Sequence, residues 1–494
     1  MTRWCAPVHA CWSTLAAAAV LLGGCAAGDS PARGDSPADD ADGDGEADGG
    51  GGGDGGQSQP VSTDERAQWV RDEVTRVNAD LAAADRAEKF AAMAESPARF
   101  FRATNHLFWA DLAADDRLAR YGRDDTRSFI LGDLHADNVG ALTDDEGRVI
   151  YDLDDVDDAF IADYQLDLWR MAVSIALVGR ENGVDGQSVA DAVAGFAGGY
   201  LTGARAFVGN GDEDDAVVDS SNAFGILDEF LADAEEETRA DLLADLTVVV
   251  DGARQLDTDR DDLDPPAPDL ADALVAAMPA YGETLSGQLP FDPDYFAVKS
   301  IARRLHAGLS SLGRPRYLVL IEGPSDADDD DVVLEAKNIP APTPYGFVSD
   351  DERARYDASF ANHAERALQA ARALGAHVDD HLGWMALPDG DFLVRERTPA
   401  EDTLDTADLD SPTRLGKLAE QWGAIAAAAH ARGDDDFRPD LVAGSLEAAV
   451  DRAVGGDDDG FAALILEVAE GYADQVAIDF ESFLPLADDV VPLR

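Results

Sequence analysis

Oxygen-bearing side chains gather in two short stretches of the chain, and each stretch follows an apolar segment with the character of a strand. Asp133 and Asn138 lie in the first stretch, and an aspartate-rich run that contains Asp155 and Asp157 forms the second. Carboxylate and amide oxygens are the ligands that a hard cation such as Mg²⁺ prefers, and Mg²⁺ sites commonly combine a few of them with substrate phosphates. Phosphoryl transfer also needs a carboxylate that orients or deprotonates the acceptor hydroxyl. The two stretches therefore predict a metal-dependent phosphoryl-transfer site.

The elements that must position these side chains are predicted from the hydrophobic pattern. Residues 128–131 and 148–151 are predicted strands of one β-loop-β unit, and residues 316–321 and 332–336 are predicted to form a hairpin around an acidic turn. Much of the remaining chain is rich in Ala and Leu, which favour helices, in the segments 164–182, 187–207, 223–250, 350–376, 411–432 and 458–476. The sequence therefore predicts an α+β, helix-rich fold.

The first acidic stretch resembles a known catalytic loop. Its pattern, Gly132-Asp133-Leu134-His135-x-x-Asn138, is similar to the G-D-x-H-x-x-N loop of aminoglycoside-phosphotransferase-like and other kinase-like enzymes. The resemblance implies that Asp133 is the catalytic base and that Asn138 and Asp155 are metal ligands, with Asp157 as a further candidate ligand. Asp155 is preferred among the neighbouring aspartates because these enzymes carry another Asp at the start of the following helix, as Asp167 does here.

A longer series of motifs resembles one bacterial family, catalogued as domain of unknown function 2252, over roughly residues 85–485. Besides the loop around Asp133, the matching segments lie at residues 96–102, 155–158, 167–170, 298–303, 308–317, 335–337, 382–384, 429–432 and 472–475. Their number and order make the resemblance specific. The resemblance predicts the fold of the chain better than it predicts the function.

Residues 308–313 resemble the glycine-rich loop of that family, and a strand lysine follows across the predicted hairpin. The resemblance implies that Gly308, Ser310, Ser311 and Gly313 form a nucleotide-binding loop. Backbone N–H groups of such a loop can cradle phosphates.

Lys337, one of only four lysines in the chain, lies in an apolar predicted strand. An unpaired ammonium group that is buried there would cost several kcal/mol, so this lysine needs a partner. A lysine can hold a phosphate as a point charge, which makes Lys337 a nucleotide-binding candidate. Glu365 is the first candidate for its partner, and Glu352 is the second.

The order of the two halves is the reverse of the order in ordinary kinases, because the catalytic loop precedes the nucleotide-loop hairpin. If both halves line one cleft, the fold is a protein-kinase-like two-lobed fold that is circularly permuted. A permutation is physically tolerable because contacts, rather than the positions of the chain ends, define a fold. The expected domain spans 63–494, with a catalytic-loop part (63–290), a nucleotide-loop hairpin part (291–400) and C-terminal helices (401–494).

The first 25 residues resemble an export signal. A single basic residue precedes the apolar run 15–22, and small residues then lead to Cys25. Small residues before a cysteine resemble the bacterial lipobox, which implies a lipoprotein-type signal peptide (1–25) with lipidation at Cys25. Residues 26–62 are rich in Gly and Asp, so a disordered tether is expected. These features predict an exported protein, anchored to the membrane at the bacterial cell envelope through its N-terminal lipid only.

Composition excludes several other classes of function. Of 494 residues, 100 are Asp or Glu and 38 are Lys or Arg, which gives a formal net charge of -62. Nucleic acids and anionic membrane surfaces are bound through basic surface, so no nucleic-acid partner is expected. The sequence has no cysteine after Cys25, which excludes disulfides and cysteine-based zinc sites from the rest of the chain.

Three functions remain open at this point. The first is Mg²⁺-dependent phosphoryl transfer from ATP or another nucleotide to an unknown hydroxyl acceptor. The second is a non-catalytic kinase-like module that binds nucleotide or metal at the cell envelope, an alternative suggested by the scarcity of ATP outside the membrane. The third is an acidic surface protein whose carboxylates hold only divalent ions and water.

Overall fold

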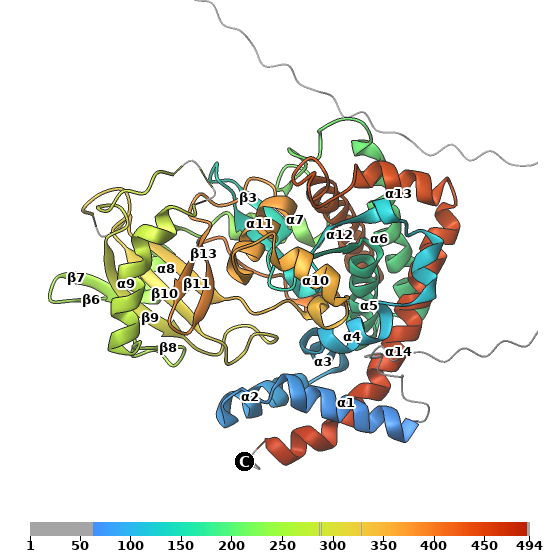
Figure 1. The fold of residues 1–494 in the computed structure, drawn as a ribbon, viewed down its shortest axis with the longest axis horizontal. Helices are drawn as coiled ribbons and strands as arrows, with labels where there is room; N and C mark the ends of the chain where they lie inside the picture. Colours follow the sequence, from blue (N-terminus) through green and yellow to red (C-terminus); the bar gives the residue numbers. More distant parts are fainter. Residues whose placement is uncertain (1–62, 286, 288, 328, 492–494) are drawn as a thin grey trace, which may run out of the picture. The chain divides into compact units, whose positions relative to one another are not determined.

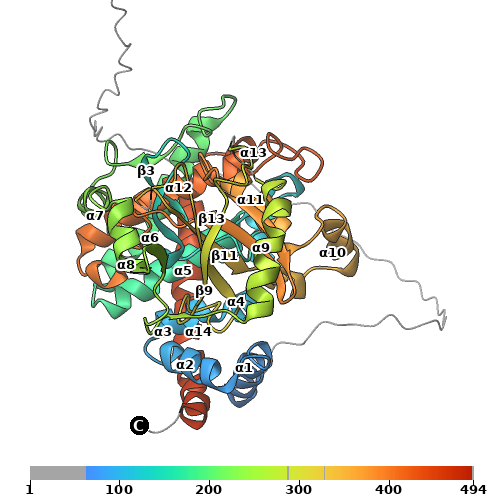
Figure 2. The same ribbon diagram turned by 90° about the vertical axis from the view of Figure 1, so that its left-hand side faces the viewer.

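The computed structural model describes residues 63–491 except 286, 288 and 328, and these residues form a mixed α+β unit (Figure 1, Figure 2). The α+β class expected from the sequence is therefore confirmed. The expected signal peptide, the lipidation residue Cys25 and the expected tether lie outside the described residues.

Helices make up most of the regular structure. The α-helices are α1 (Thr63–Val77), α2 (Ala83–Met93), α3 (Pro97–Ala103), α4 (Asn105–Leu112), α5 (Gln165–Glu181), α6 (Gly186–Phe207), α7 (Ile226–Ala234), α8 (Arg239–Leu246), α9 (Pro268–Gly282), α10 (Asp350–Asp357), α11 (His363–Leu374), α12 (Pro412–Arg432), α13 (Leu446–Val454) and α14 (Asp458–Val490). Of the helices in the described part of the chain, none combines the length and the apolar character needed to span a membrane.

The largest sheet has six antiparallel strands in the order β12-β13-β11-β10-β9-β8. Its strands are β8 (Leu263–Asp264), β9 (Val298–Arg304), β10 (Arg316–Ile321), β11 (Val332–Asn338), β12 (Gly383–Leu387) and β13 (Gly390–Glu396). The expected hairpin is present as β10 and β11, with Arg316 directly opposite Lys337.

The two faces of this sheet carry different contacts, because side chains alternate along each strand. One face packs on α9 through an apolar cluster that includes Tyr317, Val319, Ile321, Leu334, Ala336, Leu274 and Met278. The other face packs on α8 through a second cluster that includes Leu318, Leu320, Val333, Leu243 and Leu246. Glu335 and Lys337 follow Val333 at alternate positions of β11, so the alternation places them on this second face.

The larger apolar core lies among α5, α6, α12 and α14, which pack on one another (Figure 1). Two glycines let α6 and α12 approach closely. A Cβ atom on Gly423 would lie 2.2 Å from the carbonyl oxygen of Phe196, and one on Gly199 would lie 2.3 Å from the carbonyl oxygen of Glu420. The contact of these two helices therefore depends on backbone packed directly against backbone.

Short strands hold the two acidic stretches. β1 (Arg127–Ile130) pairs with β4 (Phe160–Asp163), whereas β3 (Val149–Leu153) pairs with β2 (Val139–Thr143) and β5 (Val218–Asp219). The expected β-loop-β unit is therefore wrong in its pairing, since β1 and β3 belong to different sheets. The reason is local: a short turn joins β2 directly to β3, and this hairpin supplies β3 with a partner.

The predicted helix at 223–250 is also wrong in extent. α7 ends at Ala234, and a capping box of Thr238 with Asp241 starts the separate helix α8. The next four residues form β6 (Thr247–Val250), which pairs with β7 (Ala253–Leu256). Thr and Val are β-branched, and such residues favour strands. The predicted helix at 350–376 is likewise divided into α10 and α11.

We predict that Gly423→Ala lowers the midpoint of thermal unfolding, because the added methyl group meets the backbone of α6. Overpacking of this kind typically costs about 1–3 kcal/mol. Gly416→Ala on the same helix is the matched control, since a Cβ atom there meets nothing within 4 Å. Its midpoint should stay unchanged or rise, because Ala is favoured over Gly in a helix by up to about 1 kcal/mol. Circular dichroism measures both midpoints. Equal midpoints for the two variants would contradict the close packing of α12 on α6.

Candidate functional site

The turn after β1 is held by one buried aspartate. Asp167, in the first turn of α5, accepts hydrogen bonds from the backbone N–H groups of Leu131 (2.6 Å) and Gly132 (2.9 Å). Gly132 has a φ of 72°, and a Cβ atom there would lie 2.3 Å from the carbonyl oxygen of Asp158. The turn therefore requires glycine both for its backbone conformation and for the close approach of a neighbouring loop.

Asp133 follows this glycine and is buried. Its carboxylate forms an ion pair with Arg170, which lies one turn after Asp167 on α5. Burial raises the pKa of Asp133 well above its ordinary value, and the charge of Asp155 acts in the same direction, whereas Arg170 opposes the rise. Asn138 donates a hydrogen bond to the carbonyl oxygen of Asp133 at 2.8 Å. The two ends of the motif are thus joined within one compact turn.

Lys337 lies between Asp155 and Asp157. Its Nζ atom is 2.8 Å from a carboxylate oxygen of each. The aspartates belong to the loop after β3, whereas Lys337 belongs to β11, 182 residues beyond Asp155. The Lys337 side chain is 16% exposed, compared with 35% for Asp155 and 20% for Asp157. The structure therefore brings together the lysine and the aspartates that the sequence singled out.

The pKa values of these three groups depend on one another. Burial would lower the pKa of Lys337, but the charges of Asp155 and Asp157 outweigh it and raise this pKa. Burial acts to raise the pKa of Asp155, but Lys337 lowers it to a value below the ordinary one. Burial and the charge of Asp155 raise the pKa of Asp157 to about 6. Lys337 therefore favours the ionised form of Asp155, whereas Asp157 binds its proton more tightly than an ordinary aspartate does.

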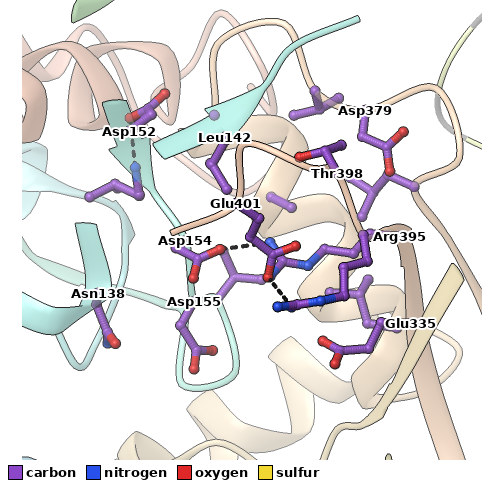
Figure 3. Close-up of a pocket in the computed structure, with 18 of the residues that line it drawn as sticks. Asn138, Leu142, Asp152, Asp154, Asp155, Glu335, Asp379, Arg395, Thr398 and Glu401 are labelled. Carbon is purple, nitrogen blue, oxygen red and sulfur yellow. Dashed lines mark hydrogen bonds and ion pairs between the residues drawn. The ribbon is translucent and has the colours of Figure 1, made fainter. Parts of the chain in front are cut away.

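The cluster lines a cavity of about 380 Å³. The walls come from the loop after β3, from β11 and β13 of the large sheet, from the C-terminal end of α11, and from the segment after β13. Figure 3 shows Asn138 and Asp155 in this cavity with their polar ends directed to the same side. Binding sites for small molecules are typically about 300–1,000 Å³ in volume. The cavity therefore has the size of a small-molecule site, and charges of both signs line it.

The predicted nucleotide-binding loop contributes to this cavity at one end. Gly308 lines the cavity, with a φ of 69°. Ser310 is directed elsewhere, since its carbonyl oxygen accepts a hydrogen bond from Lys89 of α2 at 2.7 Å. The hydroxyl oxygen of Ser311 accepts a hydrogen bond from Arg316 at 3.2 Å. A Cβ atom on Gly313 would lie 2.9 Å from the Cβ atom of Asp85 on α2. Ser310 and Gly313 are thus set against α2.

Glu365 is not a partner of Lys337, and this expectation is wrong. Glu365 lies in the first turn of α11, where its carboxylate accepts a hydrogen bond from the backbone N–H of Ala361. The second candidate, Glu352, forms an ion pair with Arg127. The fold instead brings the aspartates after β3 to the lysine.

A second set of charged residues, centred on Glu335, lies in the cavity and was not predicted from the sequence. This residue is buried and forms ion pairs with Arg304 and Arg316 (3.4 Å for the latter). Burial acts to raise the pKa of Glu335, but the surrounding arginines outweigh it and lower this pKa. The alternation of β11 was a usable indication, because Glu335 lies two residues before Lys337 and therefore on the same face.

Arg395 of β13 lies directly opposite Glu335 in the sheet and was also missed. It forms ion pairs with Asp154 at 2.7 Å and with Glu401 at 2.9 Å (Figure 3). Asp154 directly precedes Asp155, so Arg395 is a second connection between the large sheet and the loop after β3. No local pattern in the sequence indicates this pairing.

The site lies within a segment that matches a protein family. Residues 83–486 match the model of the family described as an uncharacterized protein conserved in bacteria (DUF2252), and the chain belongs to this family. No curated protein and no solved structure matches the chain. The family resemblance noted in the sequence is therefore confirmed.

We predict that Lys337→Met makes stability depend more steeply on pH. Without the ammonium group, the pKa of Asp155 rises in the folded state above that of the unfolded chain, and the pKa of Asp157, which is already raised, rises further. The folded state then binds more protons than the unfolded state, so stability falls as pH rises through this interval. The variant should therefore lose more stability, relative to the unmodified protein, at pH 8 than at pH 5. The loss of stability should stay below the roughly 3–5 kcal/mol that breaking a fully buried ion pair costs, because solvent screens the partly exposed Asp155.

Thermal midpoints measured across this pH range check the prediction. The matched control is Lys417→Met, which removes an exposed lysine on α12. Adding Asp157→Asn to Lys337→Met should restore part of the lost stability, because it removes one uncompensated charge. A loss that is independent of pH would show that the lysine acts through packing alone.

Proposed function

We propose that this protein is a Mg²⁺-dependent phosphotransferase that uses ATP or another nucleotide, with a permuted kinase-like arrangement. The observation that carries the proposal is the ion cluster of Lys337 with Asp155 and Asp157 at the wall of one cavity. Metal-dependent phosphoryl transfer needs a cationic group for the phosphates and carboxylates for the metal, and this cluster combines the two.

The donor groups fit a hard cation. The oxygens of Asn138, Asp155 and Asp157 are suitable ligands, and the Lys337 ammonium group already bonds both aspartates as a cation would. Mg²⁺ at this position would neutralise the charge of the phosphates, and Lys337 would then bind a phosphate oxygen. Asp133 is buried beside Asn138 and is not among the residues that line the cavity. In the proposed reaction, its carboxylate oxygen that does not pair with Arg170 would accept the proton of the acceptor hydroxyl.

The permuted order is supported by the positions of these residues. The turn with Asp133 and the loop with Asp155 precede β11 in the chain, yet Asp155 and Lys337 meet in space. In an ordinary kinase the strand lysine comes first. A chain opened at a different point can keep the same contacts, which is why this order is compatible with kinase-like chemistry.

A second function is favoured by the surroundings of Asp133. Its carboxylate is already paired with Arg170, and of the proposed loop only Gly308 lines the cavity among the described residues. A protein that binds nucleotide or metal without transferring phosphate would keep the cluster of Lys337 and Asp155 and would not need Asp133 free.

We predict that Mg²⁺ together with a non-hydrolysable ATP analogue raises the thermal midpoint of the full-length protein. A ligand that binds only the folded state stabilises it by about 2.7 kcal/mol at a hundredfold excess over its Kd. Asp155→Asn and Lys337→Met should each abolish the shift, and Lys417→Met should retain it. Lys337→Met should still bind Mn²⁺ alone, because both carboxylates remain. No shift with any nucleotide, or an equal shift in all variants, would overturn the proposal.

We further predict that the Asp133→Asn variant still shows the rise in thermal midpoint with Mg²⁺ and nucleotide. The variant should lose the nucleotide-dependent release of phosphate. General bases typically contribute about 10²–10⁴-fold in rate, so the loss should lie in that range. Asp124→Asn, which changes an exposed aspartate just before β1 that does not line the cavity, is the control. Nucleotide binding without any release by the unmodified protein would favour the non-catalytic alternative.

A further inference from the structure

Three basic side chains lie side by side on the face of the large sheet that lines the cavity. Arg316 of β10 is directly opposite Lys337 of β11. On the other side of β10, Arg303 of β9 is opposite Tyr317, and this register places the next residue, Arg304, beside Arg316. Arg304, Arg316 and Lys337, here called the basic row, all line the cavity. Neighbouring strands are about 4.8 Å apart, so the basic row spans about 10 Å.

The basic row is unfavourable for the sheet itself. Like charges on directly opposite residues of two strands destabilise a sheet. Basic residues are also scarce in this chain, which has 38 Lys and Arg residues against 100 Asp and Glu residues. A row of three cations in one cavity therefore indicates a site that binds negative charge.

The acidic side chains nearby match only part of this charge. Arg304 and Arg316 share one carboxylate, that of Glu335, and among the described residues neither arginine forms an ion pair with any other. The Nη1 atom of Arg316 lies 3.4 Å from Glu335, whereas hydrogen bonds between ionised groups are usually about 2.7–2.9 Å long. The Nη2 atom donates to the neutral hydroxyl group of Ser311 at 3.2 Å. A guanidinium group has five N–H donors, so Arg316 has donors left for a further anion.

Arg395, in the same cavity, shows the opposite case. It forms ion pairs with two carboxylates, those of Asp154 at 2.7 Å and Glu401 at 2.9 Å. Both distances are those of strong charge-assisted hydrogen bonds. Arg395 therefore holds the loop after β3, whereas the weaker contacts of Arg316 can be exchanged for a ligand.

The glycine-rich loop keeps space open beside Arg316. Gly308 lines the cavity, and a Cβ atom on it would lie 2.6 Å from the Oγ atom of Ser311 and 3.5 Å from the Nη2 atom of Arg316. The φ of 69° at Gly308 also favours glycine. A side chain at this position would crowd both the guanidinium group and the hydroxyl group that it contacts.

The walls of the cavity offer less to a nucleoside base than to phosphates. The described residues that line the cavity include no Phe, Tyr or Trp. Bases commonly stack on such aromatic side chains in their binding sites. The basic row, in contrast, supplies three cationic groups in line for a chain of phosphates.

We propose that the basic row binds a linear chain of phosphate groups, and that the ligand is selected by this chain rather than by a nucleoside. Inorganic tripolyphosphate and the triphosphate of a nucleotide share this chemistry. The planar guanidinium groups of Arg304 and Arg316 can each bond two oxygens of a phosphate, whereas Lys337 acts as a point charge. The inference rests on the proposed function, because the chain would include the phosphate that is transferred.

The test titrates sodium tripolyphosphate into the full-length protein in excess MgCl₂ and follows binding by isothermal titration calorimetry. ATP and adenosine are titrated in parallel. Tripolyphosphate should bind with a Kd of the same order as that of ATP, and adenosine should not bind. Because the net charge of -62 repels polyanions, a saturable signal reports a local site rather than general attraction to the surface.

The variant Arg316→Gln should weaken tripolyphosphate binding by about tenfold or more, because it removes hydrogen bonds to a charged group. Arg303→Gln is the matched control, since Arg303 precedes Arg304 on β9 but does not line the cavity. Mn²⁺ alone should bind to Arg316→Gln as it does to the unmodified protein, which shows that the variant is folded. If Arg316→Gln does not fold, Arg316→Lys retains the charge and should still weaken binding by about threefold, because the planar fork is lost.

The inference is overturned if tripolyphosphate does not bind, or if Arg316→Gln and Arg303→Gln bind it alike. ATP binding and phosphate release without tripolyphosphate binding would overturn the inference and leave the proposed phosphotransferase intact. Tripolyphosphate binding that depends on Arg316, without any release of phosphate, would support the phosphate site and contradict the transfer reaction.

Discussion

The ion cluster of Lys337 with Asp155 and Asp157 is the interaction on which the arrangement of the site depends. Charged groups in a largely buried position remain ionised only when they are paired, so β11 and the loop after β3 must keep their relative positions. Arg395 strengthens this connection through Asp154 on the same loop. Together these contacts join the large sheet to the second acidic stretch.

The backbone around the cluster is fixed by buried polar groups rather than by apolar packing alone. Asp167 holds the turn at Gly132 through two N–H groups, and Arg170, three residues later on α5, holds the side chain of Asp133. One helix thus positions both the backbone and the carboxylate of the turn. His430 of α12 contacts Asp167 at 3.2 Å, so the helical core supports the same point. Groups fixed in advance need little reorganisation during a reaction, which agrees with the role proposed for this turn.

The parts of the fold that could be predicted from the sequence are those whose pattern is local. The helices α5, α6 and α12 begin and end within one residue of the predicted segments, and the hairpin of β10 and β11 was identified from its apolar runs and acidic turn. Two of the errors arise where the pairing partner of a strand, rather than its own composition, decides the structure. The segment 247–250 continues a helical composition, but it forms a strand because residues 253–256 supply a partner. The pairing of β1 with β4 rather than with β3 is a choice of the same kind.

The sequence by itself determined the candidate site residues: a Gly-Asp turn, an aspartate run after a strand, and a rare lysine in an apolar strand. Only the tertiary structure decided that Lys337 pairs with Asp155 and Asp157 rather than with Glu365, and that Glu335 and Arg395 share the cavity. The physical reason is the range of the forces. Helix and strand patterns arise from neighbours a few residues apart, whereas an ion pair requires two atoms within a few ångströms, at any separation along the chain.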